Sequence, residues 1–214
     1  MKMFRTVLTP RTIFIFIAFE YFYILRLNFH KQTHPEKQMK NTGMIGFRVI
    51  EKSDLEIIRN EHNDESVLYM LGDPYIVTEY QQLKWWENIS SSRTNTSYLL
   101  YMDNPSNIIG IWRLQNFDIT NRSAEVGIDI FRKFRGRGLA VSSYKMAIKY
   151  LFESLNVNCI YARAGEYNEK SLRSLQSAGF KISGRIREAL FKNGKYHDNI
   201  ILCITFSEYK KQTD

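Results

Sequence analysis

The sequence has little cysteine, and that scarcity bears on two kinds of site. Only Cys159 and Cys203 occur among 214 residues. Both lie in apolar, strand-like runs, which favours buried reduced thiols over a disulfide. The four histidines show no metal-ligand spacing, whereas a zinc site needs several Cys or His ligands close together. We therefore expect neither a disulfide nor a metal.

A long apolar run that would cross a membrane is also lacking. The most hydrophobic segment, residues 12–25, is shorter than the ~20 apolar residues of a membrane-spanning helix, and Glu20 within it makes insertion more costly. No small-residue cleavage site follows, which argues against a removable signal peptide. Three interpretations stay open: a membrane-associating or signal-anchor helix, an extra packing helix, or sequence upstream of a later true start at Met39 or Met44.

The positive net charge is concentrated outside the main part of the chain. The formal charge is +8, but residues 1–43 hold seven basic against two acidic side chains, leaving 23 basic and 20 acidic after them. A nucleic-acid-binding domain gathers basic residues on one face, so we expect no nucleic-acid partner. We interpret residues 1–43 as an appendage not needed for catalysis and residues 44–210 as one domain. We expect a cytoplasmic protein, with membrane contact open only through residues 12–25.

Local signals predict alternating helices and strands. A capping box at Ser53 and Glu56 predicts a helix over 54–60, and a second at Thr78 and Gln81 predicts another. The other expected elements are a hairpin of 98–102 with 108–114, a strand over 157–164, a helix over 171–177 ended by Gly179, and strands over 182–190 and 197–206 joined by an Asn193-Gly194 turn.

Glycine is sparse as well, yet two of the eleven glycines stand in one basic turn, residues 135–140. A strand-like run over 124–130 precedes this turn, and a helix-like run over 141–155 follows it. That order presents free backbone N–H groups and a positive helix end to an anion, and the arginines add forked donors for phosphate oxygens. The segment is not a Walker loop, because no Gly-Lys-Ser/Thr follows, and its Gly spacing does not match the dinucleotide-binding fingerprint. From this segment alone, a phosphate site and a plain surface turn stay equally open.

A second block, residues 168–180, favours the phosphate site over the plain surface turn. It begins Asn-Glu-Lys-Ser and ends Ala-Gly-Phe, and the basic turn fits the pattern Arg/Gln-x-x-Gly-x-Gly/Ala at Arg135, Gly138 and Ala140. The ordered pair resembles the GNAT superfamily, the Gcn5-related N-acetyltransferases, over residues 47–206. The resemblance is greatest to the ribosomal-protein N-terminal acetyltransferases and the amino-sugar acetyltransferases of the pseudaminic-acid pathway.

This resemblance implies a fold, a cosubstrate and a set of binding residues. The fold is α/β (α+β): a mixed, mostly antiparallel sheet, splayed between strands 4 and 5, with helices on both faces. The cosubstrate is acetyl-CoA, and no metal is implied. The residues implied for acetyl-CoA are Val126, Ile128 and Ile130 on the strand, Arg135, Gly136, Arg137, Gly138, Leu139 and Ala140 in the turn, and Asn168 and Ser171 in the second block.

The catalytic groups are less well defined by the resemblance. Many family members place a tyrosine, the acid for the CoA thiolate, where this chain has Leu175. Sequences with Asn-x-x-Ser at this place are thought to use the serine, here Ser171; the alternative is that Ser171 only solvates a helix start and touches CoA. Glu125 is the candidate base, and the alternative is a carboxylate in a salt bridge. Glu188 is the second candidate, as base or amine-binding carboxylate.

For the acceptor site, the sequence offers only residue types that would suit a sugar or a nucleotide. Trp86 and Tyr98 would stack on a sugar or base, although such residues are more often core. Arg187 suits a nucleotide diphosphate, or a solvated strand edge. We expect acetyl transfer to a primary amine of a nucleotide-linked amino sugar, by a monomer or homodimer. The alternatives are acetylation of a protein N-terminus, as in the ribosomal-protein enzymes, and a non-catalytic CoA-binding module.

Overall fold

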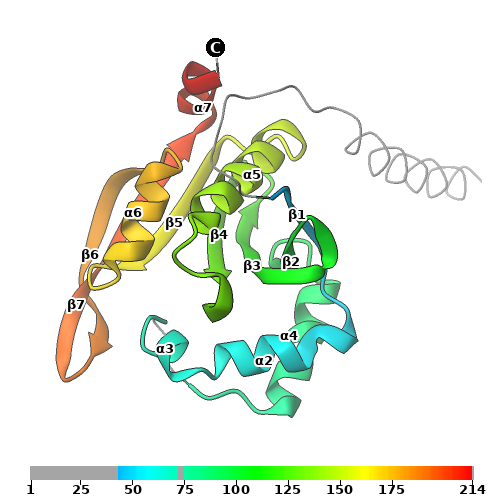
Figure 1. The fold of residues 1–214 in the computed structure, drawn as a ribbon. Coiled ribbons are helices and arrows are strands. Elements are labelled where there is room, and N and C mark those ends of the chain that lie inside the picture. Colours follow the sequence, from blue (N-terminus) through cyan, green and yellow to red (C-terminus); the bar gives the residue numbers. More distant parts are fainter. Residues whose placement is uncertain (1–42, 72–74, 214) are drawn as a thin grey trace, which may run out of the picture. The chain divides into compact units, whose positions relative to one another are not determined.

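A seven-stranded sheet in the order β1-β2-β3-β4-β5-β7-β6 organises the computed structural model, which describes residues 43–71 and 75–213 (Figure 1). All neighbouring strands are antiparallel except β4 and β5, which are parallel. The strands are β1 Ile45–Val49, β2 Thr96–Met102, β3 Asn104–Asp118, β4 Ser123–Ile130, β5 Cys159–Gly165, β6 Lys181–Lys192 and β7 Lys195–Thr205. The predictions made for residues 12–25 lie outside the described residues.

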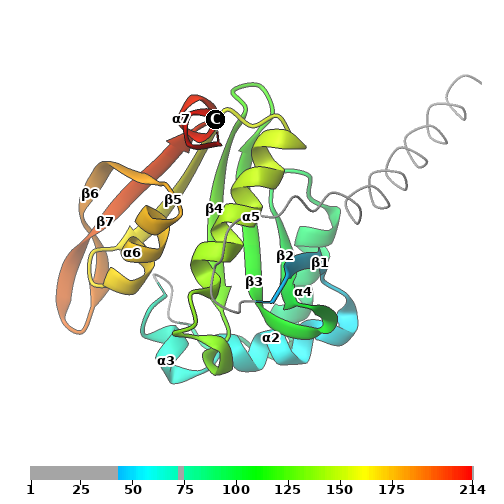
Figure 2. The ribbon, with the colours of Figure 1, turned by 45° about the horizontal axis from the view of Figure 1, so that its top comes forward.

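Helices flank this sheet on both sides (Figures 1 and 2). The α-helices are α2 Leu55–His62, α3 Glu65–Leu68, α4 Glu79–Ser91, α5 Leu139–Glu153, α6 Glu169–Ser177 and α7 Phe206–Thr213, and two 3-10 turns are η1 Lys52–Asp54 and η2 Arg132–Phe134. Within the described ranges, no helix combines the length and apolar character needed to cross a membrane. The predicted fold class, a mostly antiparallel mixed sheet with helices on both faces, is confirmed.

Two apolar cores lie on opposite faces of the sheet. Leu100 and Trp112 belong to the larger core, which α5 and α6 cover, while Leu99 and Ile111 belong to the smaller one beneath α2 and α4. Because successive side chains of a strand point to opposite faces, β2 and β3 contribute to both cores. Leu99, Leu100 and Trp112 have no measurable exposure, so the central strands are held firmly from both sides.

The parallel pair β4 and β5 separates soon after it forms. The two strands are paired from Ser123 and Cys159 to Glu125 and Tyr161, and no further. On its other side β4 remains paired with β3 as far as Ile130. The edge of β4 from residue 126 to 130 therefore faces β5 without a strand partner. This opening, called the splay below, is the one predicted between strands 4 and 5.

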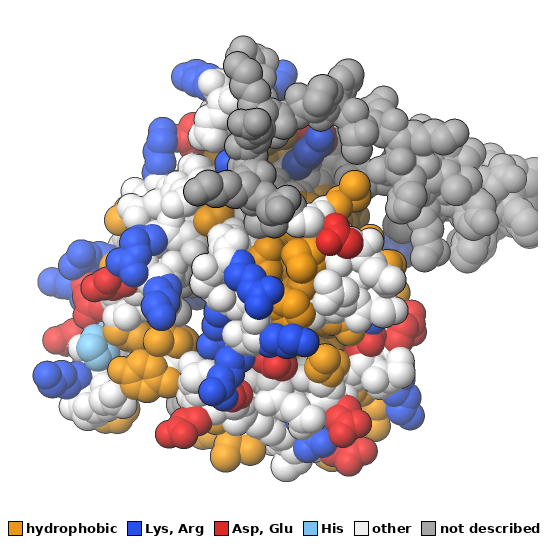
Figure 3. Space-filling view, in the orientation of Figure 1, with side chains coloured by type: hydrophobic (Ala, Val, Ile, Leu, Met, Phe, Trp, Pro, Cys, Tyr) orange, Lys and Arg blue, Asp and Glu red, His pale blue; other side chains and the backbone are white. Residues whose placement is uncertain are grey.

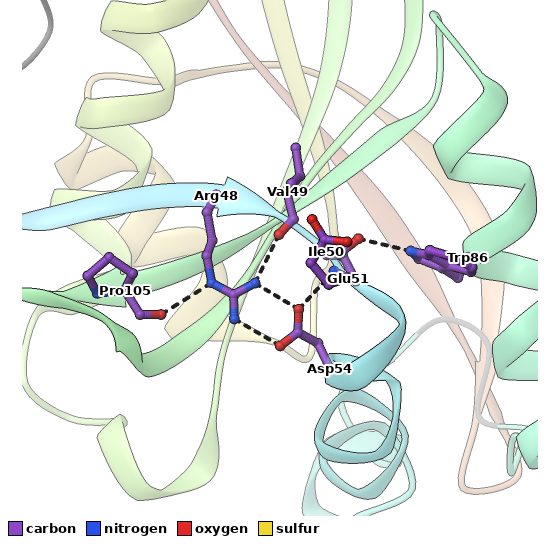
Figure 4. Close-up of polar contacts among 7 residues, drawn as sticks. All are labelled: Arg48, Val49, Ile50, Glu51, Asp54, Trp86 and Pro105. Carbon is purple, nitrogen blue, oxygen red and sulfur yellow. Dashed lines mark hydrogen bonds and ion pairs between the residues drawn. The ribbon is translucent and has the colours of Figure 1, made fainter. Parts of the chain in front are cut away.

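The start of the first helix differs from the prediction. Asp54 accepts the backbone N–H of Glu51 at 2.8 Å, and two nitrogens of the Arg48 guanidinium donate to its carboxylate oxygens at 2.7 and 2.8 Å (Figure 4). This bidentate pair holds the pKa of Asp54 below its ordinary value, through the hydrogen bonds from Arg48 first. The predicted Ser53–Glu56 capping box is wrong. Arg48 on β1 binds the carboxylate of Asp54, and the cap forms at Asp54 instead.

Other local signals are confirmed. The Thr78 hydroxyl accepts the Gln81 N–H, and the Gln81 side chain accepts the Thr78 N–H, which is a reciprocal capping box at the start of α4. Asn193 and Gly194 both have positive φ, 50° and 75°, as a tight turn between antiparallel strands requires. Interactions between near neighbours in the chain therefore predicted this helix cap and this turn correctly.

Candidate functional site

The turn between β4 and α5 presents an open row of backbone donors. Gly136 and Gly138 have φ of 77° and 75°, and α5 begins at Leu139 without a side-chain cap. Among the described residues, no group accepts a hydrogen bond from the backbone N–H groups of residues 136–140. A Cβ at either glycine would meet nothing within 4 Å, so the surface above them is free. Free N–H groups at a helix N-terminus suit phosphate oxygens.

The two arginines of this turn have structural partners. Arg135 donates from Nε to the carbonyl of Ile130 at 2.9 Å, which closes the turn onto the end of β4. Arg137 lies over the ring of Phe134 at 5.6 Å and donates to the carbonyl of Lys133. The fully available donors of the turn are thus its backbone N–H groups, while the arginines shape it and add positive charge.

The splay is bounded by β4 on one side and by the start of α6 on the other. Val126 and Ile130 are buried in the larger core and Ile128 packs against it, so their side chains anchor β4 while its backbone edge stays open. Asn168 is the N-cap of α6, and its Oδ1 accepts the backbone N–H of Ser171 at 3.1 Å. The structure thus brings the residues predicted for acetyl-CoA to one opening.

Tyr144, which the sequence did not single out, lies on α5 within the larger core. It is only 4% exposed, and its ring meets Phe180 edge-on at 5.8 Å. Burial first, and then the charge of Asp129, raise the pKa of Tyr144 to about 12, while the charge of Arg113 acts in the opposite direction. Tyr144 is thus a neutral side chain of the larger core on α5.

Glu125 is held by two partners rather than free. Arg163 donates from Nε and Nη2 to its two oxygens at 2.8 and 2.6 Å, and Asn116 donates to Oε2 at 2.9 Å. Its carboxylate lies at the last β4–β5 pair, before the splay opens. Both oxygens of this carboxylate are therefore already occupied by donors. The geometry therefore favours the salt-bridge alternative for Glu125.

A histidine–carboxylate pair lies at the far end of β5. His197 Nδ1 is 3.2 Å from Glu166 Oε1, and the imidazole meets the ring of Tyr167 at 5.2 Å. The backbone N–H of Glu166 donates to the carbonyl of Asp198, which fixes this end of β5 against β7. No local pattern in the sequence joins these two residues, because Glu166 is 31 positions from His197 in the chain.

Glu188 and Arg187 lie further from the splay. With Asp198 they line a cavity of about 700 Å³ on the β6–β7 hairpin. Glu188 has φ of 51° where the register of β6 shifts, and its backbone N–H donates to Asp198 Oδ1 at 3.0 Å. Because β7 lies between β6 and β5, the structure does not bring Glu188 to the edge of β4.

The aromatic residues predicted for the acceptor are packed inside the molecule. The indole N–H of Trp86 donates to the carbonyl of Ile50 at 2.9 Å, and the ring packs against the smaller core (Figure 4). Tyr98 stacks on Trp112 with 4.9 Å between ring centroids, and burial raises the pKa of its hydroxyl. This packing favours the alternative interpretation of both residues as core.

The surface charges are mixed. On the face drawn in Figure 3, Lys and Arg side chains stand among Asp, Glu and apolar ones. Among the described residues, no group of three or more His, Cys, Asp or Glu could hold a metal ion. Cys159 and Cys203 are free thiols, each partly buried. The candidate site therefore consists of the anion-binding turn before α5, the open edge of β4 and a few titratable side chains around them.

Comparisons with known proteins agree with this arrangement. The sequence model of the acetyltransferase (GNAT) domain matches residues 45–181. A spermidine N(1)-acetyltransferase of Vibrio cholerae is 28% identical over 173 residues, which cover 80% of this chain and 99% of the relative. YdaF of Bacillus subtilis, provisionally named a ribosomal N-acetyltransferase, is 28% identical over 174 residues, which cover 78% of this chain and 93% of YdaF.

A solved structure gives the same result for the fold. Spermidine N-acetyltransferase from Vibrio cholerae, in complex with CoA and spermine, superposes with a TM-score of 0.72 at 26% identity. The match covers 78% of this chain and 98% of that chain.

Proposed function

The chain belongs to the GNAT acetyltransferase family and is an acetyl-CoA-dependent N-acetyltransferase, and we propose that its acceptor is a primary amine of a small polyamine. The amino sugar expected from the sequence is not supported, because several relatives that match along nearly their whole length are spermidine N(1)-acetyltransferases. The domain boundaries remain a proposal: residues 44–210 form the transferase, and residues 1–43 are an appendage.

One structural observation carries the proposal for the donor site. The open edge of β4 lies between the cradle at the start of α5 and the cap of α6. We propose that the N–H groups of residues 136–140 bind the pyrophosphate, and that the edge of β4 from residue 126 to 130 binds the pantetheine arm by backbone hydrogen bonds. Asn168 keeps its side-chain N–H groups for the same arm.

The proposed mechanism is direct attack by the amine. Bound acetyl-CoA supplies an acetyl thioester. A backbone N–H on the open edge of β4 polarises the acetyl carbonyl and stabilises the charge that develops on its oxygen. His197, oriented by Glu166, accepts the proton that the attacking amine loses. This pair replaces Glu125 as the proposed base, because Arg163 already binds both oxygens of that carboxylate.

Acidic side chains near the opening suit a cationic acceptor. Asp129 on β4 is ion-paired to Arg113 at 2.9 Å through one oxygen, and its side chain remains 35% exposed. The side chain of Glu166 is 44% exposed. Two partly exposed carboxylates flank the splay, one from β4 and one from the end of β5, and they would attract a polyamine carrying several ammonium groups.

An acceptor panel tests the proposal. Release of the CoA thiol is followed with acetyl-CoA and, in separate reactions, spermidine, spermine, a peptide with a free N-terminus and a nucleotide-linked amino sugar. We expect turnover with the polyamines and a product heavier by one acetyl group. Turnover with the peptide alone would favour the ribosomal-protein alternative, which the similarity to YdaF supports. Thiol release with none of them, despite CoA binding, would favour a non-catalytic module.

A further inference from the structure

Lys192, the last residue of β6, carries a buried ammonium group that the proposed mechanism does not use. The residue is only 8% exposed. Its Nζ donates to the carbonyls of Leu68 and Leu71, at 3.2 and 3.0 Å. The same nitrogen lies 5.7 Å from the ring centroid of Tyr69 and 5.8 Å from that of Tyr167. Because a buried ammonium is costly unless it is hydrogen-bonded or held against aromatic faces, these four groups are what stabilise it there.

The partners of this ammonium belong to two segments that are far from it in the chain. Leu68 ends α3, Tyr69 is its C-cap, and Leu71 follows two residues later. Tyr167 lies in the turn between β5 and α6. Its hydroxyl also donates to the carbonyl of Leu71, at 3.5 Å. The tip of the β6–β7 hairpin, the end of α3 and the turn after β5 therefore meet around the ammonium of Lys192.

The other end of α3 is attached to the β4 side of the splay. The Arg132 guanidinium donates to Asp64, the N-cap of α3, at 3.1 Å. Arg135, whose Nε binds the carbonyl of Ile130 at the end of β4, donates from Nη1 to the Ser66 hydroxyl at 3.4 Å. Helix α3 thus lies across the open end of the splay, from the end of β4 to the turn after β5 (Figures 1 and 2).

The ring of Tyr167 connects this arrangement to the proposed base. Its centroid is 5.2 Å from that of His197, and the two rings meet edge-on. A Cβ at Gly165 would come within 2.5 Å of the Tyr167 ring, so the ring lies directly against the last residue of β5. An amine that gives its proton to His197 therefore approaches beside Tyr167 and the end of α3.

We propose that Lys192 is a positioning residue for the acetyl transfer, and that it holds the end of α3 and the ring of Tyr167 together as one wall of the acceptor site. The inference rests on the proposed function, in which the acceptor amine meets His197 at the end of β5. The amine must be oriented close to the thioester carbon before it can attack, and a displaced wall loses part of that orientation. In this role Lys192 acts through its carbonyl and ring partners and contacts neither the amine nor CoA.

The test compares Lys192→Met with Lys195→Met. Lys195 is exposed and lies opposite Lys192 across the same hairpin turn, so its variant removes an equal charge without touching α3. With any amine that the wild-type enzyme acetylates, we expect the KM for the amine to rise at least about tenfold in Lys192→Met, because two hydrogen bonds from a charged donor are lost. The kcat and the Kd for CoA should change less than about threefold, a split that a general loss of structure would not give. Lys195→Met should keep all three values within about twofold of the wild type.

A second variant tests the same wall without removing the buried cation. Tyr69→Leu takes away one aromatic face from a residue that is 45% exposed, and we expect the KM for the amine to rise about threefold. This variant decides the question alone if Lys192→Met does not fold. The proposal is overturned if either variant keeps the KM of the wild type, or if CoA binding weakens as much as the KM for the amine rises. The acceptor panel and His197→Gln test the proposed function separately, so the two failures are distinguishable.

Discussion

Arg163 on β5 grips Glu125 on β4 with two parallel hydrogen bonds, from Nε at 2.8 Å and from Nη2 at 2.6 Å. The pair lies where the parallel strands are last in register, directly before they part. Glu125 is 8% exposed, so its charge depends on this partner and on Asn116 for compensation. The pair therefore marks the point from which the splay opens.

Removing the arginine should destabilise the fold. Arg163→Ala leaves a mostly buried carboxylate with only Asn116 as donor, and we expect the free energy of unfolding to fall by about 1–3 kcal/mol. Denaturant titration measures it. The control is Arg173→Ala, which removes an exposed ion pair with Glu169 within α6 and should cost less than about 0.5 kcal/mol. Equal losses for the two variants would contradict the structural role of Glu125.

The cradle can be tested with two glycines that have the same φ. Gly138→Asp places a negative side chain at the proposed pyrophosphate site, and we expect CoA affinity to fall at least about 100-fold by calorimetry, because like charges repel there. Gly194→Asp is the control, since Gly194 also has φ of 75° and open space around its Cβ. Both variants incur the same strain of positive φ. Unchanged CoA affinity in Gly138→Asp would show that the pyrophosphate binds elsewhere.

The proposed base is tested by changing its ring. His197→Gln removes the imidazole that Glu166 orients, and we expect kcat/KM for the acceptor to fall about 10²-fold. Affinity for CoA should remain, because the cradle is untouched. His62→Gln on α2 is the control, since that ring contacts only the Tyr75 carbonyl at 3.1 Å among the described groups. Full activity in His197→Gln would show that water or another carboxylate accepts the proton of the amine.

Acid stability should depend on Glu208. Hydrogen bonds from Lys181 first, and then from the Thr205 backbone, lower the pKa of Glu208 to about 2. Because the folded-state pKa lies below that of the unfolded chain, the ionised group contributes stability above about pH 4.3. That contribution disappears as the pH falls toward about 2.

Thermal melts of Glu208→Gln and the wild type measure this dependence. The two melting temperatures should differ most above pH 5 and converge near pH 2. Glu169→Gln is the control, because the partner of Glu169 is an exposed arginine one turn along the same helix. A difference between Glu208→Gln and the wild type that stays constant across the whole range would contradict the assigned ion pair.

Much of the local structure was predictable, and some predictable features were missed. The Asn193-Gly194 turn and the Thr78 cap follow from neighbouring residues alone. Helix α7 was not predicted, although Thr205-x-x-Glu208 is the same kind of signal: the Glu208 carboxylate accepts the Thr205 N–H at 3.0 Å, and the Thr205 hydroxyl accepts the Glu208 N–H at 3.4 Å. The cap predicted at Ser53 is wrong for a non-local reason: Arg48, on a separate strand, binds the carboxylate of Asp54 and fixes the cap there.

By itself, the sequence determined the family and predicted a donor site, because the strand, the glycine turn and the helix that form the cradle are contiguous in the chain. Only the tertiary structure decided which titratable groups are free to act. Glu125 is occupied by an arginine 38 positions away, and His197 acquires its carboxylate from 31 positions away. Such pairings depend on how strands and helices are assembled, and no local pattern records them.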